Sequence, residues 1–133
     1  MKEVNTRVSV IIPVRNEEKH IRDCIASVRD FTDEILVLDS LSTDRTVEFA
    51  RESGARIESR PFDNYPAQRN HAIDLARSDW IFFIDADERA APGVGQEIRA
   101  QIESCNSQFV IQNSKFHPEH YRRVATRSPN FEF

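Results

Sequence analysis

The hydrophobic positions of this chain form short continuous runs that alternate with helical stripes. Three apolar runs, Val8–Val14, Ile35–Leu38 and Trp80–Ile84, predict strands that are buried on both faces of a parallel sheet. Residues 55–58 predict a shorter strand, and residues 109–111 are a candidate for a fifth. The segments between these predicted strands are therefore the places to look for helices.

Between the strands, apolar residues recur at the spacing of an amphipathic helix. The first stripe consists of Ile21, Cys24, Ile25, Val28 and Phe31. We expect Asn16 to cap this helix and Ser42 or Thr43 to cap a second one, because short polar side chains accept hydrogen bonds from a helix N-terminus. Gly54 stands where a glycine commonly ends a helix.

Two further helices are expected in the second half of the pattern. One begins after Asn64 or Tyr65, with Pro66 in its first turn and Ala72, Ile73 and Ala76 facing inward. The other begins at Pro92. Strands that alternate with helices predict an α/β fold with a doubly wound, mainly parallel sheet. We assign residues 1–112 to this domain and residues 113–133 to a tail whose structure the pattern leaves uncertain.

Composition narrows the class of protein. The 133 residues include 18 Lys and Arg against 22 Asp and Glu, a net charge of −4, which gives no support for binding nucleic acid. Two cysteines are too few for a disulfide framework, and no apolar run approaches the roughly 20 residues that cross a bilayer. The start of the chain lacks the apolar stretch of a secretory signal. We therefore expect a cytoplasmic protein without a transmembrane segment.

Candidate chemistry gathers at the carboxyl ends of the expected strands, where ligands bind in open α/β sheets. Asp85 and Asp87 directly follow the last strand, and residues two apart in an extended segment face the same way. Clustered carboxylates repel one another unless a cation joins them, so this pair favours Mg²⁺ or Mn²⁺. A structural role as a turn or helix cap remains open for Asp39 and, more so, for Asp44.

Four segments, in this order and spacing, resemble a known family: VSVIIPVRNEE, EILVLDSLSTDRT, AQRNHAI and WIFFIDADE. They are similar to the nucleotide-sugar-binding half of family 2 glycosyltransferases, which have the Rossmann-like GT-A fold. The form AQRNHAIDLA before DADE looks like the bacterial subgroup that adds glucose or a related sugar to the lipopolysaccharide core. The resemblance covers roughly residues 6–104.

The resemblance implies a role for each matching position. The segment Pro13–Glu17 would lie against the nucleoside, with Glu17 near the ribose, and Asp39 would accept a hydrogen bond from the base. Arg69, which the pattern places on the helix side opposite Ala72 and Ile73, would lie beside the base or diphosphate. The implied donor-binding residues are Pro13, Arg15, Glu17, Asp39, Arg69 and Asp85, and the implied metal residue is Asp87.

The implied reaction transfers a sugar, with inversion, from a UDP-sugar-type donor to the hydroxyl of a glycan or glycolipid acceptor. A divalent cation would neutralise the charge that grows on the diphosphate. The general base stays unknown, because none of the acids after the D-x-D pair, Glu97, Glu103, Glu119 and Glu132, has a context that resembles the family base. The region that binds the acceptor is also not recognisable, so an incomplete donor-binding module is the main alternative.

Two other enzyme classes share parts of the pattern. FFIDAD is an apolar strand that runs into D-x-D, as in haloacid-dehalogenase-type phosphatases, but Arg89 stands where that family has Thr or Val. Nucleotidyltransferases generally have a Gly-rich loop after the first strand, and PVRNEE contains no glycine.

Two kinds of partner are also expected. An uncovered sheet edge would favour homo-oligomers. Any peripheral membrane contact would lie at the inner face of the cytoplasmic membrane.

Overall fold

The computed structural model describes residues 7–78, 80–100 and 123–126. The strands are β1 (Val8–Val14), β2 (Glu34–Asp39), β3 (Arg56–Ser59), β4 (Trp80–Phe83) and β5 (Arg123–Thr126), and the helices are α1 (Ile21–Val28), α2 (Thr46–Glu52) and α3 (Tyr65–Leu75). Residues 94–100 form a further helical segment. The strands make one sheet in the order β3-β2-β1-β4-β5, and every pair is parallel. The expected α/β fold with a parallel sheet is confirmed.

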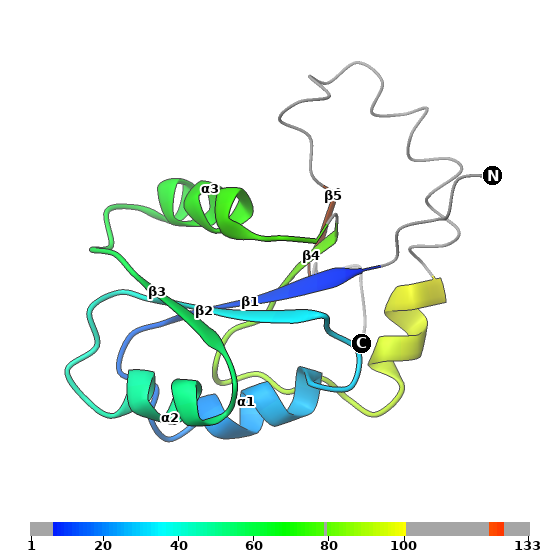
Figure 1. Ribbon diagram of the computed structural model, residues 1–133, viewed down its shortest axis with the longest axis horizontal. Coiled ribbons are helices and arrows are strands. Elements are labelled where there is room, and N and C mark those ends of the chain that lie inside the picture. The colour runs from blue at the N-terminus through cyan, green and yellow to red at the C-terminus, as the bar shows by residue number, and fades with distance from the viewer. Residues whose placement is uncertain (1–6, 79, 101–122, 127–133) are drawn as a thin grey trace, which may run out of the picture.

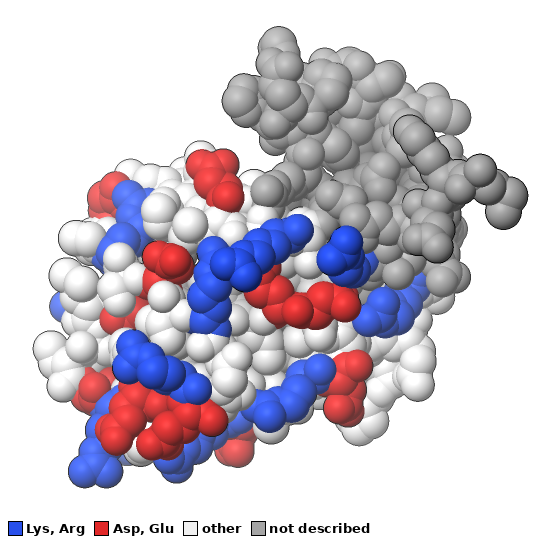
Figure 2. Space-filling model, viewed as in Figure 1, with Lys and Arg blue, Asp and Glu red and all other residues white. Residues whose placement is uncertain are grey.

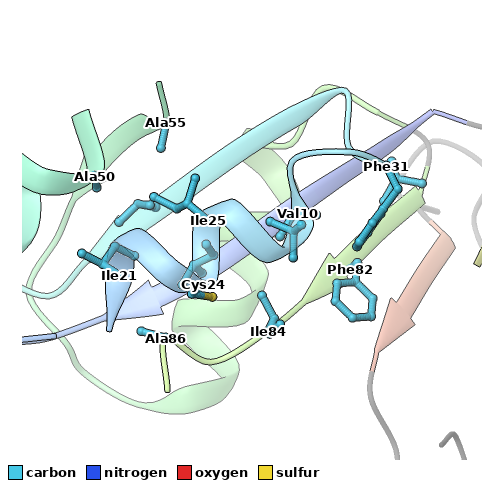
Figure 3. Packing of buried hydrophobic residues seen from close by; sticks show 14 of the residues in the cluster. Val10, Ile21, Cys24, Ile25, Phe31, Ala50, Ala55, Phe82, Ile84 and Ala86 are labelled. Carbon is cyan, nitrogen blue, oxygen red and sulfur yellow. The ribbon is translucent and has the colours of Figure 1, made fainter. Parts of the chain in front are cut away.

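Helices cover both faces of this sheet (Figure 1). Alternate residues of β1 point to opposite faces, because side chains alternate along a strand. Val10 and Ile12 belong to the cluster that packs against α1, whereas Ile11 belongs to the cluster that packs against Ala72 of α3. The first cluster is shown in Figure 3, where Cys24 and Ile25 of α1 lie over the strands.

The sheet order reverses at β1, which is the first strand in sequence and the central strand in space. β1 pairs with β2 on one side and with β4 on the other, and the chain reaches these neighbours through crossovers on opposite faces. Such a reversal opens a crevice at the carboxyl ends of the strands, because the flanking helices diverge there. The fold therefore places the ends of β1, β2 and β4 around one crevice.

Several sequence expectations about helix ends can be compared directly with the structure. α3 begins directly after Asn64, as expected, and the Asn64 side-chain oxygen caps it by accepting a hydrogen bond from the Ala67 N–H at 2.8 Å. Gly54 follows α2 with a φ of +91°, which is the left-handed conformation that favours glycine.

The expected caps of α1 and α2 were wrong. α1 begins only at Ile21, and Asn16 instead has a φ of +55° and turns its side chain toward the next loop. α2 begins at Thr46, after both Ser42 and Thr43. The strand β5 lies within residues 113–133, whose structure the pattern left uncertain. Residues 109–111, the candidate fifth strand, lie outside the described residues.

Candidate functional site

A cleft of about 910 Å³ opens at the carboxyl edge of the sheet. Its apolar part comes from strand residues such as Ile11, Leu38 and Phe83, and one wall comes from the first turns of α3 and the loop before it. Charged side chains from the loops after β1 and β4 complete the lining. The residues that line the cleft are Ile11, Pro13, Val14, Arg15, Glu17, Leu38, Ser40, Phe62, Tyr65, Pro66, Gln68, Arg69, Asn70, Phe83, Asp85, Ala86 and Asp87.

Asp85 and Asp87 stand on a tight turn at the end of β4. The Glu88 N–H donates to the Asp85 carbonyl at 2.9 Å, and the Glu88 carboxylate accepts from the Asp85 N–H at 3.0 Å. The expectation of an extended segment was therefore wrong. Ala86 between the two acids is 3 % exposed and packs into the core, while both acids are exposed and line the cleft. The turn thus presents two carboxylates to one space.

Contacts with Cys24 and Arg89 hold this turn in place. The buried thiol of Cys24 donates to the Asp85 carbonyl at 3.5 Å. Burial raises the pKa of Cys24 to about 12, with Asp85 and Asp87 adding to the rise and Arg89 opposing it, so the thiol keeps its proton. The Arg89 guanidinium donates to the carbonyls of Ala86 and Glu88, both at 2.7 Å. These contacts hold the turn that carries the two acids.

Arg69 lies across the same cleft. Its guanidinium carbon is 4.6 Å from the centre of the Phe83 ring, a cation–π contact with the end of β4. The helical pattern had placed Arg69 on the side opposite Ala72 and Ile73, yet in the structure Arg69 extends over the sheet edge. A cation therefore faces the space into which Asp85 and Asp87 also open.

The loops after β1 and β2 are joined by a set of hydrogen bonds that we call the loop clamp, formed by residues 16–18 and 42–46. The Asn16 N–H donates to the Ser42 hydroxyl at 2.9 Å, and the Asn16 side chain accepts from the Thr43 N–H at 2.8 Å. The Glu17 N–H donates to the Thr46 hydroxyl at 2.8 Å. Because Arg15 and Glu17 line the cleft next to these bonds, the clamp fixes one of its walls.

Asp44 is the acid that organises the clamp. One carboxylate oxygen accepts from the Thr46 N–H at 2.9 Å and from the Thr46 hydroxyl, and the other accepts from the Glu18 N–H at 3.3 Å. Burial raises the pKa of Asp44, but these hydrogen bonds outweigh it and hold the pKa below its ordinary value of 3.8. The structural role that the sequence left open for Asp44 is confirmed.

Asp39 lies at the end of β2 but not among the residues that line the cleft. It is 2 % exposed, and both carboxylate oxygens accept from the Ser42 N–H, at 3.1 and 3.3 Å. Its neighbour Ser40 does line the cleft, together with Gln68 of α3. The structure therefore brings six of the seven predicted site residues into one cleft, whereas Asp39 is buried and is not among the lining residues.

Gln68 is a lining residue that the sequence analysis missed. It is 5 % exposed, and its amide nitrogen donates to the Ser40 hydroxyl at 2.9 Å. The available signal was its position four residues before Ala72, which puts a polar residue on the inward side of the helix. Phe62 and Tyr65 also line the cleft and pack edge to face, with ring centres 5.1 Å apart.

Comparison with known proteins identifies the family. The model of glycosyl transferase family 2 matches residues 9–131. The chain belongs to glycosyl transferase family 2. An uncharacterized glycosyltransferase of Rickettsia conorii is 36 % identical over 105 residues, which cover 79 % of this chain and 37 % of that protein.

Solved structures of glycosyltransferases show the same fold. The crystal structure of glucosyl-3-phosphoglycerate synthase from Mycobacterium tuberculosis, in complex with Mn²⁺, UDP and glucosyl-3-phosphoglycerate, matches with a TM-score of 0.55 and 33 % identity, over 60 % of this chain and 33 % of that chain. Mannosyl-3-phosphoglycerate synthase from Rubrobacter xylanophilus matches with a TM-score of 0.59 and 26 % identity, over 66 % of this chain and 33 % of that chain.

These matches show the family and how much of its members' length this chain spans. Membership of glycosyl transferase family 2 decides against the phosphatase and nucleotidyltransferase alternatives. The family 2 chain spans roughly a third of the length of the relatives described above, 37 % and 33 %. Among the residues that the structure describes, no helix has the length and apolar character needed to cross a membrane. On the face shown in Figure 2, acidic and basic side chains are interspersed.

Proposed function

We propose that this chain binds a UDP-sugar-type donor in the cleft and transfers the sugar, with inversion, to an acceptor hydroxyl. The observation that carries the proposal is that Asp85 and Asp87 face the same space as the Arg69 guanidinium. A diphosphate carries negative charge that both a cationic side chain and a carboxylate-held metal ion can neutralise. Membership of a glycosyltransferase family then supplies the reaction class.

The carboxylates of Asp85 and Asp87 are suitable ligands for a hard divalent cation. Within the described ranges, no group of three or more His, Cys, Asp or Glu side chains converges to form an all-protein metal cage. Mg²⁺ and Mn²⁺ are commonly held by one or two carboxylates, with phosphate oxygens and water completing the shell. We propose that Asp87 holds the ion and that Asp85 binds the nucleotide-sugar donor. When bound, the ion stabilises the negative charge that develops on the departing diphosphate.

The remaining predicted residues would position the nucleoside. Pro13 lies in β1, and Arg15 and Glu17 follow this strand on a wall that the hydrogen bonds of the loop clamp hold in place. Rigid positioning supports transfer because a donor held in one geometry reacts without first losing conformational freedom. We propose that Asp39, at the end of β2, accepts a hydrogen bond from the base, a role that requires its buried carboxylate, now bonded to the Ser42 N–H, to become accessible from the cleft.

The second candidate function is a donor-binding module that needs another part to complete the reaction. The observation that favours it is that the chain spans only 37 % of the Rickettsia conorii relative. Glu97, the one candidate base within the described residues, is exposed on the helical segment 94–100 and is not among the cleft residues. Glu103, Glu119 and Glu132 lie outside the described residues. The general base therefore stays unassigned.

Calorimetric titration of UDP with Mn²⁺ tests the proposed site. We expect binding that Asp87→Asn weakens by about tenfold or more, since a neutral amide is a poor ligand for a hard cation. Asp30→Asn is the matched control, because Asp30 is exposed at the end of α1 and does not line the cleft. Equal loss in both variants, or no binding of UDP to the unaltered chain, contradicts the proposal.

Turnover separates the two candidate functions. Incubation of the chain with a UDP-sugar and a lipopolysaccharide-core acceptor would release UDP and form an inverted glycoside if the chain is a complete transferase. Proton NMR of the product reports the anomeric configuration. UDP binding without any release of UDP supports the donor-binding module instead, whereas a retained configuration contradicts the proposed inversion. This assay also tests the glycolipid acceptor that the subgroup resemblance implies.

A further inference from the structure

A second cavity, of about 510 Å³, lies at the edge of the sheet opposite the proposed donor cleft. Its lining comes from the amino ends of the strands, since Arg7 directly precedes β1, Glu34 begins β2 and Arg56 begins β3. Because these strands are parallel, their amino ends meet at one edge of the sheet (Figure 1). The seven residues of β1, roughly 20 Å of strand, therefore separate this cavity from the cleft.

The lining of this cavity carries more positive than negative charge. The charged residues in it are Arg7, Arg29, Arg56, Arg77, Asp33 and Glu34, four cations against two anions. The chain as a whole has a net charge of −4, so the local excess of cations is opposite to the average. Cations that share one cavity repel one another, and an anion bound among them removes this repulsion.

The two acids are already engaged in contacts that hold the strands. The Asp33 carboxylate accepts from the Val8 N–H at 3.0 Å. The Glu34 side chain is only 11 % exposed; one carboxylate oxygen pairs with Arg56 at 2.5 Å, and the other accepts from the backbone N–H of Arg77 at 2.9 Å. The Arg77 guanidinium stays 4.0 Å from the Glu34 carboxylate, which is beyond hydrogen-bond distance. Glu34 therefore neutralises Arg56 more fully than Arg77.

The guanidinium groups of Arg29 and Arg77 keep donors for a ligand. A guanidinium has five N–H donors. Among the described residues, the Arg29 side chain donates one hydrogen bond, to the Ser53 carbonyl, and the polar contact of the Arg77 side chain is the 4.0 Å approach to Glu34. The Arg77 side chain is 76 % exposed, so packing does not hold it away from the cavity. These donors point to an oxyanion as the ligand.

We propose that this cavity binds the phosphate group of a phosphorylated molecule, with Arg29 and Arg77 as its main ligands. The planar fork of a guanidinium matches two phosphate oxygens, so each arginine can donate two parallel hydrogen bonds to the group. A volume of about 510 Å³ lies within the roughly 300–1,000 Å³ of small-molecule sites, which leaves room for the rest of the molecule. The site is separate from the donor cleft and does not depend on the proposed reaction.

Titration of the ¹⁵N-labelled chain with inorganic phosphate, followed by NMR, tests the site. EDTA in the buffer removes divalent cations, which would otherwise carry phosphate into the cleft. We expect saturable shifts of the amide signals of Arg29, Gly54 and Arg77. Arg29→Gln and Arg77→Gln should each weaken binding by about tenfold, as expected for the loss of a charge-assisted hydrogen bond. Arg51→Gln is the matched control, because Arg51 is an exposed arginine of α2 that lines neither cavity.

Arg69→Gln separates this site from the cleft, which Arg69 lines. If Arg69→Gln weakens phosphate binding and Arg77→Gln does not, the anion occupies the cleft, and the proposal is overturned while donor binding stands. Equal weakening by Arg77→Gln and Arg51→Gln also overturns it, because the attraction is then one of general surface charge. Absence of saturable shifts at the amino edge of the sheet has the same consequence.

Vesicles of phosphatidylcholine, with and without phosphatidic acid, identify the source of the phosphate group. Cosedimentation that requires phosphatidic acid, and that is weakened by Arg77→Gln but not by Arg51→Gln, assigns the group to a lipid headgroup. Binding of inorganic phosphate without cosedimentation assigns it to a soluble molecule. Both results support the site, because each depends on the Arg77 guanidinium.

Discussion

Replacement of Thr46 by valine tests whether the loop clamp stabilises the fold and the cleft together. Thr46 is fully buried, and its hydroxyl both accepts from the Glu17 N–H at 2.8 Å and donates to Asp44. Valine keeps the shape of the side chain but leaves the Glu17 N–H without a partner. An unsatisfied buried donor costs about 1–3 kcal/mol, so we expect a loss near 2 kcal/mol in the free energy of unfolding.

A loss of this size is measurable for a domain of 133 residues. At roughly 3 °C for each kcal/mol, the melting temperature should fall by about 6 °C. Thr43→Val is the matched control, because Thr43 is exposed and its hydroxyl contributes only a 3.4 Å contact to Asn16. We expect the control to change stability by less than about 0.5 kcal/mol. An unchanged melting temperature of Thr46→Val, or an equal loss in the control, would show that the Thr46 hydroxyl does not stabilise the fold through the loop clamp.

The same variant changes the response to acid. The pKa of Asp44 lies below 3.8 in the folded chain, because hydrogen bonds to its carboxylate outweigh the effect of burial. A carboxylate with a lowered pKa stabilises the fold above its ordinary pKa, and this stabilisation is lost as the pH falls through the lowered value. Thr46→Val removes one of the donors, so acid unfolding followed by circular dichroism should begin at a higher pH than in the unaltered chain.

Two further substitutions probe packing and the opposite edge of the sheet. Gly95→Ala should destabilise the fold by about 1–3 kcal/mol, because an added Cβ would lie 2.5 Å from the Phe31 Cβ, and urea unfolding measures the loss. Glu34→Ala should cost about 3 kcal/mol, since the Glu34 carboxylate pairs with Arg56 at 2.5 Å and accepts from the buried Ser9 hydroxyl at 2.6 Å. If the Glu34→Ala chain has the same melting temperature as the unaltered chain, water replaces these contacts without loss of stability.

The strands and inward-facing helix positions were predictable from the sequence for a simple physical reason. Burial on both faces requires continuous apolar runs, and β1 coincides with the run Val8–Val14. The stripe from Ile21 to Val28 is buried throughout its inward positions, as its helical spacing predicted. Asp85 and Asp87 could be placed at the cleft for a related reason, because the end of a buried strand fixes where the next residues emerge.

Features that depend on contacts between loops were not predictable in this way. Asn16 and Thr43 have the residue types of helix caps, but they bond to each other because β1 and β2 are neighbours in the sheet. Gln68 reads as an ordinary polar helix residue until Ser40 is brought beside it. β5 escaped prediction because its four residues, Arg123–Thr126, carry no continuous apolar run.

In the proposed function, UDP and a divalent cation occupy the cleft between Arg69 and the turn of Asp85 and Asp87. The most direct measurement is a crystal structure of the chain with UDP and Mn²⁺, in which anomalous scattering locates the metal. We expect a manganese peak bound by the Asp87 carboxylate and by diphosphate oxygens, with the nucleoside lying along the loop after β1. A peak elsewhere, or a nucleotide bound outside the cleft, would contradict it.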